Sequence, residues 1–220
     1  MKHADIENYY LTYFKLFDSL NISIGLSKAA FDLSLNNGIT AMYLIKNARY
    51  ERVYVFDKKL VENLSQIYKI NINDNMLESI RSVKFDLAIS LAGILHMEPF
   101  NDFIIEVHKS LNVGGKLILA IYPEIYDDSG RDIMGAFEQR KIGYIYRYIL
   151  NAIKNIFSYV SETNVIQDAT VSEIKYLLLN RGYLKYIVNS NMDKSIIFRY
   201  IDKTNKRYFF CWNIIEAIKL

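Results

Sequence analysis

The stretch AAFDLSLNNGIT, residues 29–40, joins an apolar run, an acid and a polar turn in direct succession. Its first residues predict a short buried strand that ends at Asp32, and the residues after Gly38 predict a helix. Between them, Ser34, Asn36 and Gly38 stand at alternate positions of the turn. Parallel α/β sheets bind their ligands at turns that lead from a strand into a helix. The residues of this turn therefore indicate which ligand the chain could bind.

Short apolar runs alternate with helical patterns on both sides of this stretch. Strands that are apolar on both faces and separated by helices predict a parallel α/β sheet covered on each side. An amphipathic helix precedes the sheet, because aromatic residues recur there at intervals of three or four. The expected strands are 28–33, 52–57, 70–72, 85–92 and 116–122, and the expected helices are 5–20, 38–47, 58–68 and 100–111.

The pattern changes after Pro123. Apolar residues at every third or fourth position predict a long helix over about 133–160, within an insert at 127–165. A second helix, 170–182, opens with a capping-box spacing and closes on a glycine. Strands are expected at 183–189, 195–202 and 206–215, with the last two joined as an antiparallel hairpin.

Two kinds of nucleotide-binding loop place their glycines differently in such a turn. The dinucleotide fingerprint requires glycine at the positions of Ser34, Asn36 and Ile39, and none of them is glycine. A nicotinamide- or flavin-dependent oxidoreductase is therefore disfavoured. The alternative is an acid followed by glycines two, four and six residues later. Asp32 and Gly38 match that pattern, whereas Ser34 and Asn36 depart from it.

This second pattern resembles the signature loop of the class I S-adenosylmethionine (SAM) dependent methyltransferases. The resemblance continues in order along the chain and covers roughly residues 25–125 and 168–213. It implies a doubly wound, mostly parallel seven-stranded sheet, a Rossmann-like methyltransferase fold with an antiparallel C-terminal hairpin. The segments that carry it are VYVFD, ININDNM, FDLAISLAGILHM, VHKSLNVGGKLILAIYP and TVSEIKYLLLNRGYLKYIVN.

The resemblance also implies which residues would bind SAM as cofactor. Asp57 matches the acid that accepts hydrogen bonds from both ribose hydroxyls, and Asp74 matches the acid that takes the adenine amino group. Asp32 matches an acid that lies near the cofactor's amino group or braces the loop. His96 follows the fourth strand, where an imidazole with a pKa near neutrality could act as general base. The expected cofactor-binding residues are Asp32, Ser34, Asn36, Gly38, Asp57, Asp74, Asn75 and Ser90.

The departures from the family loop leave two functions open. Ser34 and Asn36 stand where the family packs the methionine part of SAM against glycines. Asparagine tolerates left-handed backbone, so the turn can survive, but its side chain must then hydrogen-bond the cofactor or block it. One hypothesis is a SAM-dependent methyltransferase that transfers a methyl group in line to a small-molecule acceptor. The other is a non-catalytic scaffold or regulatory protein of this fold that has lost cofactor binding.

Absent motifs narrow the expected acceptor. The fourth predicted strand runs into SLAG instead of the Asn/Asp-Pro-Pro-aromatic motif found in methylators of adenine or glutamine amides. No cysteine lies in this region, which argues against the covalent route to pyrimidine C5. A net charge of +3 is too mild to indicate a nucleic-acid binder. A small molecule is therefore the expected partner, and a homo-oligomer is left open.

The length and composition predict one globular domain over residues 1–220, with a helical cap at 1–24 and the insert at 127–165 as a lid. The resemblance implies that this domain is methyltransferase-like. The single cysteine, Cys211, excludes an internal disulfide and any multi-cysteine metal site, so no metal is expected. No apolar segment suits a signal peptide, and none is long enough to span a membrane. We therefore expect a cytoplasmic protein.

Overall fold

The computed structural model describes residues 14–20, 22, 28–34, 38–56, 65–69, 80–91, 99–133, 136–171, 174 and 206–220. The chain divides into two compact units. Unit 1 comprises Met1–Ser19, Tyr122–Tyr144 and Asn164–Trp212, and unit 2 comprises Leu20–Ile121, Ile145–Thr163 and Asn213–Leu220.

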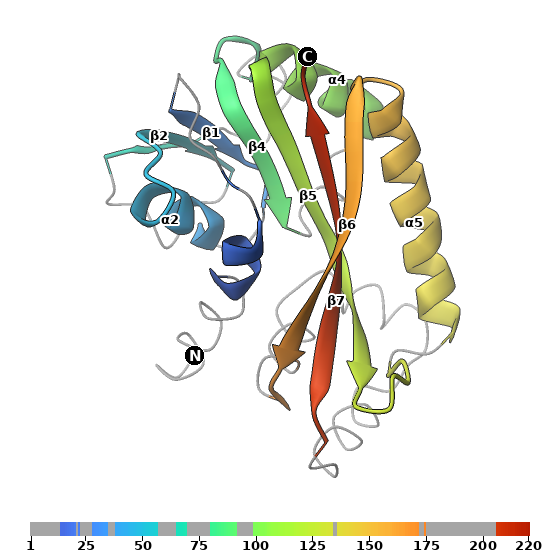
Figure 1. Cartoon of the computed structure of the whole chain (residues 1–220). Helices are drawn as coiled ribbons and strands as arrows, with labels where there is room; N and C mark the ends of the chain where they lie inside the picture. Colours follow the sequence, from blue (N-terminus) through green and yellow to red (C-terminus); the bar gives the residue numbers. More distant parts are fainter. Residues whose placement is uncertain are drawn as a thin grey trace. The chain divides into compact units, whose positions relative to one another are not determined.

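Seven strands form one sheet in the order β3-β2-β1-β4-β5-β7-β6 (Figure 1). The pairs β1–β2, β1–β4, β2–β3 and β4–β5 are parallel. β7 runs antiparallel to β5, because the N–H of Gly114 and the carbonyl of Lys219 bond at 2.7 Å, and the N–H of Lys219 bonds the Gly115 carbonyl at 3.0 Å. The predicted fold class, a doubly wound and mostly parallel seven-stranded sheet, is confirmed. The elements are β1 Ala29–Asp32, α2 Ile39–Lys46, β2 Arg52–Val55, β3 Ile67–Lys69, β4 Phe85–Leu91, α4 Phe100–Ser110, β5 Leu111–Asp127, α5 Ala136–Lys154, β6 Tyr159–Ala169 and β7 Tyr208–Ile218.

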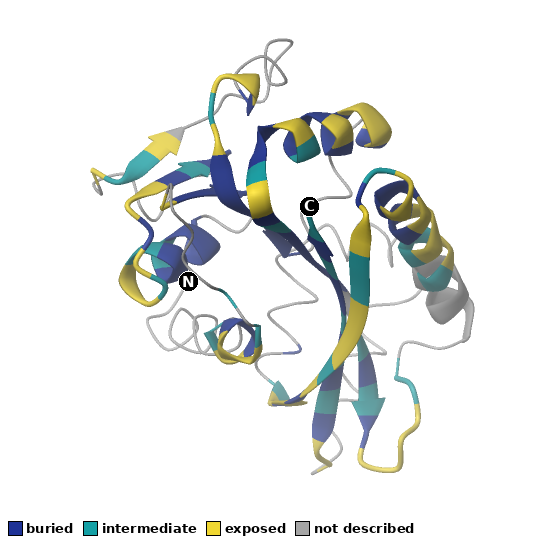
Figure 2. Cartoon of the chain, turned by 45° about the horizontal axis from the view of Figure 1, so that its top comes forward, coloured by how far each residue is buried: buried dark blue, intermediate teal, exposed yellow. Residues whose placement is uncertain are grey.

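In unit 2, the central strands β1 and β4 are buried along their whole length (Figure 2). Successive side chains of a strand point to opposite faces of the sheet, so neighbouring residues serve different layers. Phe31 packs in one hydrophobic core with Phe103 of α4 and Ile153 of α5. Asp32, the next residue, faces the other layer and bonds the N-terminal turn of α2. Helices therefore cover both faces, as the alternating sequence pattern predicts.

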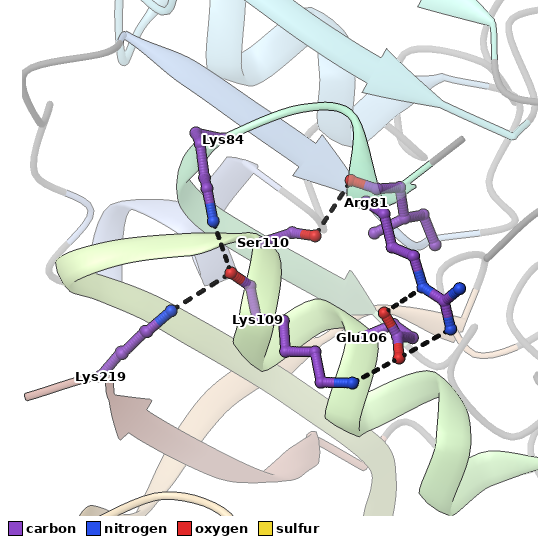
Figure 3. Close-up of polar contacts among 7 residues, drawn as sticks. Arg81, Lys84, Glu106, Lys109, Ser110 and Lys219 are labelled. Carbon is purple, nitrogen blue, oxygen red and sulfur yellow. Dashed lines mark hydrogen bonds and ion pairs between the residues drawn. The ribbon is translucent and has the colours of Figure 1, made fainter. Parts of the chain in front are cut away.

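Lysine side chains cap the C-terminal end of α4 (Figure 3). The last carbonyls of a helix lack partners within the helix and carry partial negative charge, so ammonium groups stabilise them. Lys219 Nζ donates to three of these carbonyls, and Lys84 Nζ donates to that of Lys109 at 2.8 Å. Burial and the nearby Lys84 both lower the pKa of Lys219. The three acceptors of Lys219 are His108 at 2.9 Å, Lys109 at 3.2 Å and Leu111 at 2.8 Å.

The same helix carries a buried carboxylate, Glu106, whose charge is neutralised by two basic side chains (Figure 3). Glu106 is 4% exposed and accepts two hydrogen bonds from the Arg81 guanidinium, at 2.6 and 3.0 Å. The Lys109 ammonium donates to it as well, at 2.9 Å. These donors, Arg81 first, lower the pKa of Glu106 to about 2 although its burial acts in the opposite direction. The pair ties α4 to the segment that precedes β4.

The run LNVGG, residues 111–115, lies at the start of β5. Gly114 has φ of 78°, a left-handed conformation that favours glycine. A Cβ on Gly115 would lie 2.8 Å from the Asn112 carbonyl oxygen, so this position has no room for a side chain. Asp86 holds the same edge, since its carboxylate accepts from the Lys28 N–H at 2.7 Å and from Asn112 Nδ2 at 2.8 Å. Asp86 thus has a structural role at the edge where β4 begins.

In unit 1, β5 ends in a tight turn built on Asp127. Its carboxylate accepts the N–H groups of Ser129 and Arg131, each at 3.0 Å. Gly130 takes the left-handed conformation, with φ of 74°. After the turn, the N–H of Ile133 bonds the Ile125 carbonyl at 2.9 Å, so the chain briefly runs back along the strand. The polar run YDDSGRD, residues 126–132, therefore folds as a turn centred on Asp127.

The helix predicted over 133–160 is wrong at its C-terminal end. α5 ends at Lys154, and β6 begins at Tyr159. Apolar residues continue at helical spacing up to Val160, and for this reason the predicted helix extends past the true end of α5. Four β-branched residues between 160 and 166 favour a strand instead. Part of the expected helical insert is thus the strand β6, and its role as a lid stays a prediction.

The strand β3 also differs from the prediction. It lies at Ile67–Lys69 and overlaps the last two residues of the helix expected over 58–68. A strand of three residues is too short to show the alternating apolar pattern that distinguishes a strand from a helix. The strands expected at 70–72, 183–189 and 195–202 lie outside the described residues, and with them the hairpin partner of 206–215. Of the helix expected at 170–182, the structure describes only the start, where the Ile174 N–H bonds the Thr170 carbonyl at 3.0 Å.

Candidate functional site

The carboxyl ends of three parallel strands meet at one edge of unit 2. Asp32 pairs with Val55 of β2 on one side and with Ile89 of β4 on the other. The Leu33 N–H continues the β1–β4 ladder with a 2.7 Å bond to the Ile89 carbonyl. The turn from β1 into α2 therefore leaves the sheet between the ends of β2 and β4. Chain order reverses at this point, where open α/β sheets bind ligands.

Asp32 braces the turn that follows it. Its carboxylate is fully buried and accepts the Ser34 N–H at 2.8 Å and the Ala41 N–H at 3.1 Å. Ala41 lies in the first turn of α2, where N–H groups lack partners within the helix and where a negative charge is favourable. Of the two roles that the family resemblance allowed for Asp32, bracing of the loop is present in the structure.

Ser34 is turned into the protein and not toward solvent. The residue is 1% exposed, and its hydroxyl oxygen accepts the backbone N–H of Leu91 at 2.9 Å. Thr40 Oγ1 donates to the same oxygen at 3.1 Å. The side chain that replaces a family glycine is therefore occupied by internal hydrogen bonds. Sequence reasoning missed Thr40, although a hydroxyl residue in the first turn of the predicted helix was a visible signal.

Gly38 is the N-cap of α2 and has φ of 89° and ψ of 13°. This left-handed conformation is accessible to glycine without steric cost. The Gly38 carbonyl then accepts the first bond of the helix, from the Met42 N–H at 2.9 Å. The surviving glycine of the loop thus sits where the backbone requires one.

Ser90 is fully buried in β4 beside this edge. Within the part of the chain that the structure describes, its hydroxyl has no hydrogen-bond partner. Buried hydroxyls normally have a hydrogen-bond partner, so the Ser90 hydroxyl is a polar group of this site that no described residue satisfies. Five other predicted site residues lie outside the described residues: Asn36, Asp57, Asp74, Asn75 and His96.

The described ranges contain no group of three or more His, Cys, Asp or Glu residues that could hold a metal ion. None of the helices within them is both long enough and apolar enough to cross a membrane.

Comparisons with known proteins identify the fold. No protein-family model matches the sequence, and a search of curated proteins gives no match either. Among solved structures, a putative type II methyltransferase from Anaeromyxobacter dehalogenans is 11% identical and has a TM-score of 0.56, with 95% of each chain covered. A geranyl diphosphate methyltransferase in complex with SAM is 12% identical with a TM-score of 0.53, and covers 96% of this chain and 85% of its own.

A putative methyltransferase from Bacillus halodurans is also similar, at 10% identity and a TM-score of 0.52, with 95% of this chain and 98% of that chain covered. The chain spans about half (52%) of the Haemonchus contortus phosphoethanolamine N-methyltransferase 2, which is 14% identical with a TM-score of 0.48. The structural similarities and the strand order together show that this chain has the class I SAM-dependent methyltransferase fold.

Proposed function

We propose that this chain is a SAM-dependent methyltransferase that acts on a small-molecule acceptor. The observation that carries the proposal is the position of Ser34. Its buried hydroxyl bonds Leu91 and Thr40, so the residue that replaces a loop glycine is directed inward. Together with left-handed Gly38, this supports a turn of the cofactor-binding type despite the altered sequence. Of the two departures that favoured loss of cofactor binding, the one at Ser34 is thereby weakened, and the one at Asn36 lies outside the described residues.

The proposed cofactor site lies along the carboxyl edge of β1, β2 and β4. Asp57 follows β2 by two residues and would accept the ribose hydroxyls of SAM. Asp74 and Asn75 would contact the adenine ring. The β1–α2 turn, with Asn36, would hold the methionine part. The hydroxyl of Ser90, which has no hydrogen-bond partner among the described residues, supplies a further polar group near the same edge.

Bound SAM would supply a methyl group on a positively charged sulfonium, from which the neutral thioether S-adenosylhomocysteine leaves readily. The protein therefore needs mainly to position the acceptor in line with the methyl group and to exclude water. His96 is the candidate general base, which would take a proton from the acceptor as the new bond forms. No further catalytic group is required for this reaction.

A small-molecule acceptor rather than nucleic acid agrees with the mild net charge of +3. The one cysteine of the chain fits a reducing compartment, so the cytoplasm is part of the proposal. Whether copies of the chain associate is left to a measurement of mass in solution.

A crystal structure grown with saturating S-adenosylhomocysteine, the demethylated product, tests the proposal. We expect the ligand at the carboxyl edge of β1 and β2, with its ribose against Asp57 and with Asn36 either bonded to it or turned aside. A cleft filled by protein atoms under those conditions would favour a scaffold or regulatory protein. A strong salt dependence of RNA binding would favour a nucleic-acid acceptor instead.

A further inference from the structure

We propose that Ser34 is a positioning residue that fixes the two sides of the candidate site to each other. The Ser34 link comprises the two hydrogen bonds that Ser34 Oγ accepts, from Thr40 Oγ1 at 3.1 Å and from the Leu91 N–H at 2.9 Å. The proposal deepens the function proposed above, on which its ligand-binding consequence rests. It gives the serine a specific task instead of treating it as a glycine that was lost.

The Ser34 link joins segments that are far apart in the sequence. Ser34 and Leu91 are 57 residues apart, and Leu91 is the last residue of β4. Ser34 lies in the turn after β1, and Thr40 lies in the first turn of α2. One side-chain oxygen thus connects the turn that would hold the cofactor to the strand end from which the segment with His96 continues. A glycine at position 34 has no atom that could make this connection.

Burial gives the Ser34 link its strength. Both Ser34 and Thr40 are almost completely buried, at 1% and 0% exposure, and Leu91 is 1% exposed. Removal of the hydroxyl would leave the Leu91 N–H without this acceptor in a site closed to water, which is much more costly than the loss of an exposed hydrogen bond. Asp32 adds a second brace to the same turn, through the Ser34 and Ala41 N–H groups. The side-chain link and the carboxylate thus hold Ser34, at the start of the turn, to the first turn of α2 and to the end of β4.

Two interpretations of Ser34 make opposite predictions for one substitution. If Ser34 only obstructs a glycine loop, Ser34→Gly restores the family sequence and tightens SAM binding. If the Ser34 link positions the site, both Ser34→Gly and Ser34→Ala weaken SAM binding, because each removes the acceptor oxygen. Thr40→Val keeps the shape of its side chain and leaves the bond to Leu91 in place, so it should have a smaller effect.

The test combines a readout without ligand and a readout with SAM on the full chain. We expect Ser34→Ala and Ser34→Gly to raise the hydrogen-exchange rate of the Leu91 amide about tenfold, and to raise the dissociation constant for SAM by a similar factor. Ser110→Ala is the matched control, because Ser110 is equally buried in unit 2 and donates to the Ile80 carbonyl at 3.0 Å. It should change neither quantity.

Tighter SAM binding by Ser34→Gly, or an unchanged exchange rate at Leu91 in both Ser34 variants, would overturn the positioning role. Effects of Ser110→Ala equal to those of Ser34→Ala would also overturn it, because they would indicate general loss of stability. If the unsubstituted protein binds no SAM, the proposed function fails, and the exchange rate at Leu91 still decides whether the Ser34 link fixes the site.

Discussion

The carboxylate of Asp32 lies 3.1 Å from the backbone nitrogen of Ala41, and it joins the end of a central strand to the first turn of the next helix. The same carboxylate holds the turn between them through the Ser34 N–H at 2.8 Å. An acid at the end of the first strand of this fold is thus a structural part of the loop.

Replacement of Asp32 by asparagine should destabilise the protein. Asparagine has only one acceptor oxygen for the Ser34 and Ala41 N–H groups, and its NH₂ group would face one of these donors. We therefore expect a loss of about 1–3 kcal/mol in the free energy of unfolding. Urea unfolding at neutral pH measures it. Asp102→Asn, at an exposed acid in the first turn of α4, is the control and should lose less than about 0.5 kcal/mol. Equal losses would contradict the bracing role.

Glu106 should give the protein an acid-sensitive contribution to stability. Its pKa in the folded state is about 2, below the ordinary value of 4.5 that it regains on unfolding. The carboxylate therefore stabilises the fold above about pH 4.5, and this contribution disappears as the pH falls toward about 2. Glu106→Gln should unfold more easily than the unsubstituted protein at pH 7, and the difference should shrink over that interval.

Urea unfolding at a series of pH values measures this effect. Glu51→Gln serves as the control, because Glu51 pairs with Lys28 while its side chain is 63% exposed. That variant should follow the unsubstituted protein at every pH. A difference for Glu106→Gln that stays constant from neutral to acid pH would show that its ionisation is not coupled to folding.

The number of helix carbonyls that each lysine caps predicts the cost of its removal. Lys219→Met should lower the free energy of unfolding by about 1–2 kcal/mol, because three carbonyls at the end of α4 lose a charged donor. Lys84→Met removes one such bond at an exposed position and should cost less than half as much. Thermal unfolding of the two variants side by side gives the ranking, and a larger loss for Lys84→Met would refute it.

The two glycines at the start of β5 should respond differently to alanine. Gly115→Ala places a Cβ 2.8 Å from a backbone carbonyl oxygen, so the turn must shift, and we expect a loss of about 2 kcal/mol or more. Gly114→Ala meets no atom within 4 Å and carries only the strain of left-handed backbone, about 1 kcal/mol. Chemical unfolding of both variants checks the order; a reversed order would show that space around the turn is not what selects glycine.

The strands that were buried and apolar could be predicted from the sequence, whereas β3 and β6 could not. β4 is buried at all seven positions, so its apolar run is unambiguous. β6 is an edge strand with mostly exposed or half-exposed residues, and its apolar positions continue the spacing of α5. β3 has only three residues. Edge and short strands depend on their neighbours for stability, which a local pattern does not contain.

The sequence indicated where the candidate site lies, but not which side chains contact one another there. The acid after β1 and the glycine before α2 identified the turn, since each fits a local requirement of backbone or charge. The inward direction of Ser34 could not be predicted, because its partner Leu91 is 57 residues away. The hydrogen bond of Thr40 depends on the same inward direction of Ser34, although Thr40 follows Ser34 by only six residues.

Calorimetric titration of the full chain with SAM tests the central claim most directly. We expect saturable binding, and we expect Asp57→Ala to weaken it at least about tenfold through loss of the charged acceptor for the ribose. Asp102→Ala, at an exposed acid of α4, should bind like the unsubstituted protein. Absence of both binding heat and a rise in unfolding temperature at millimolar SAM would contradict the claim, and would leave a methyltransferase fold without its cofactor.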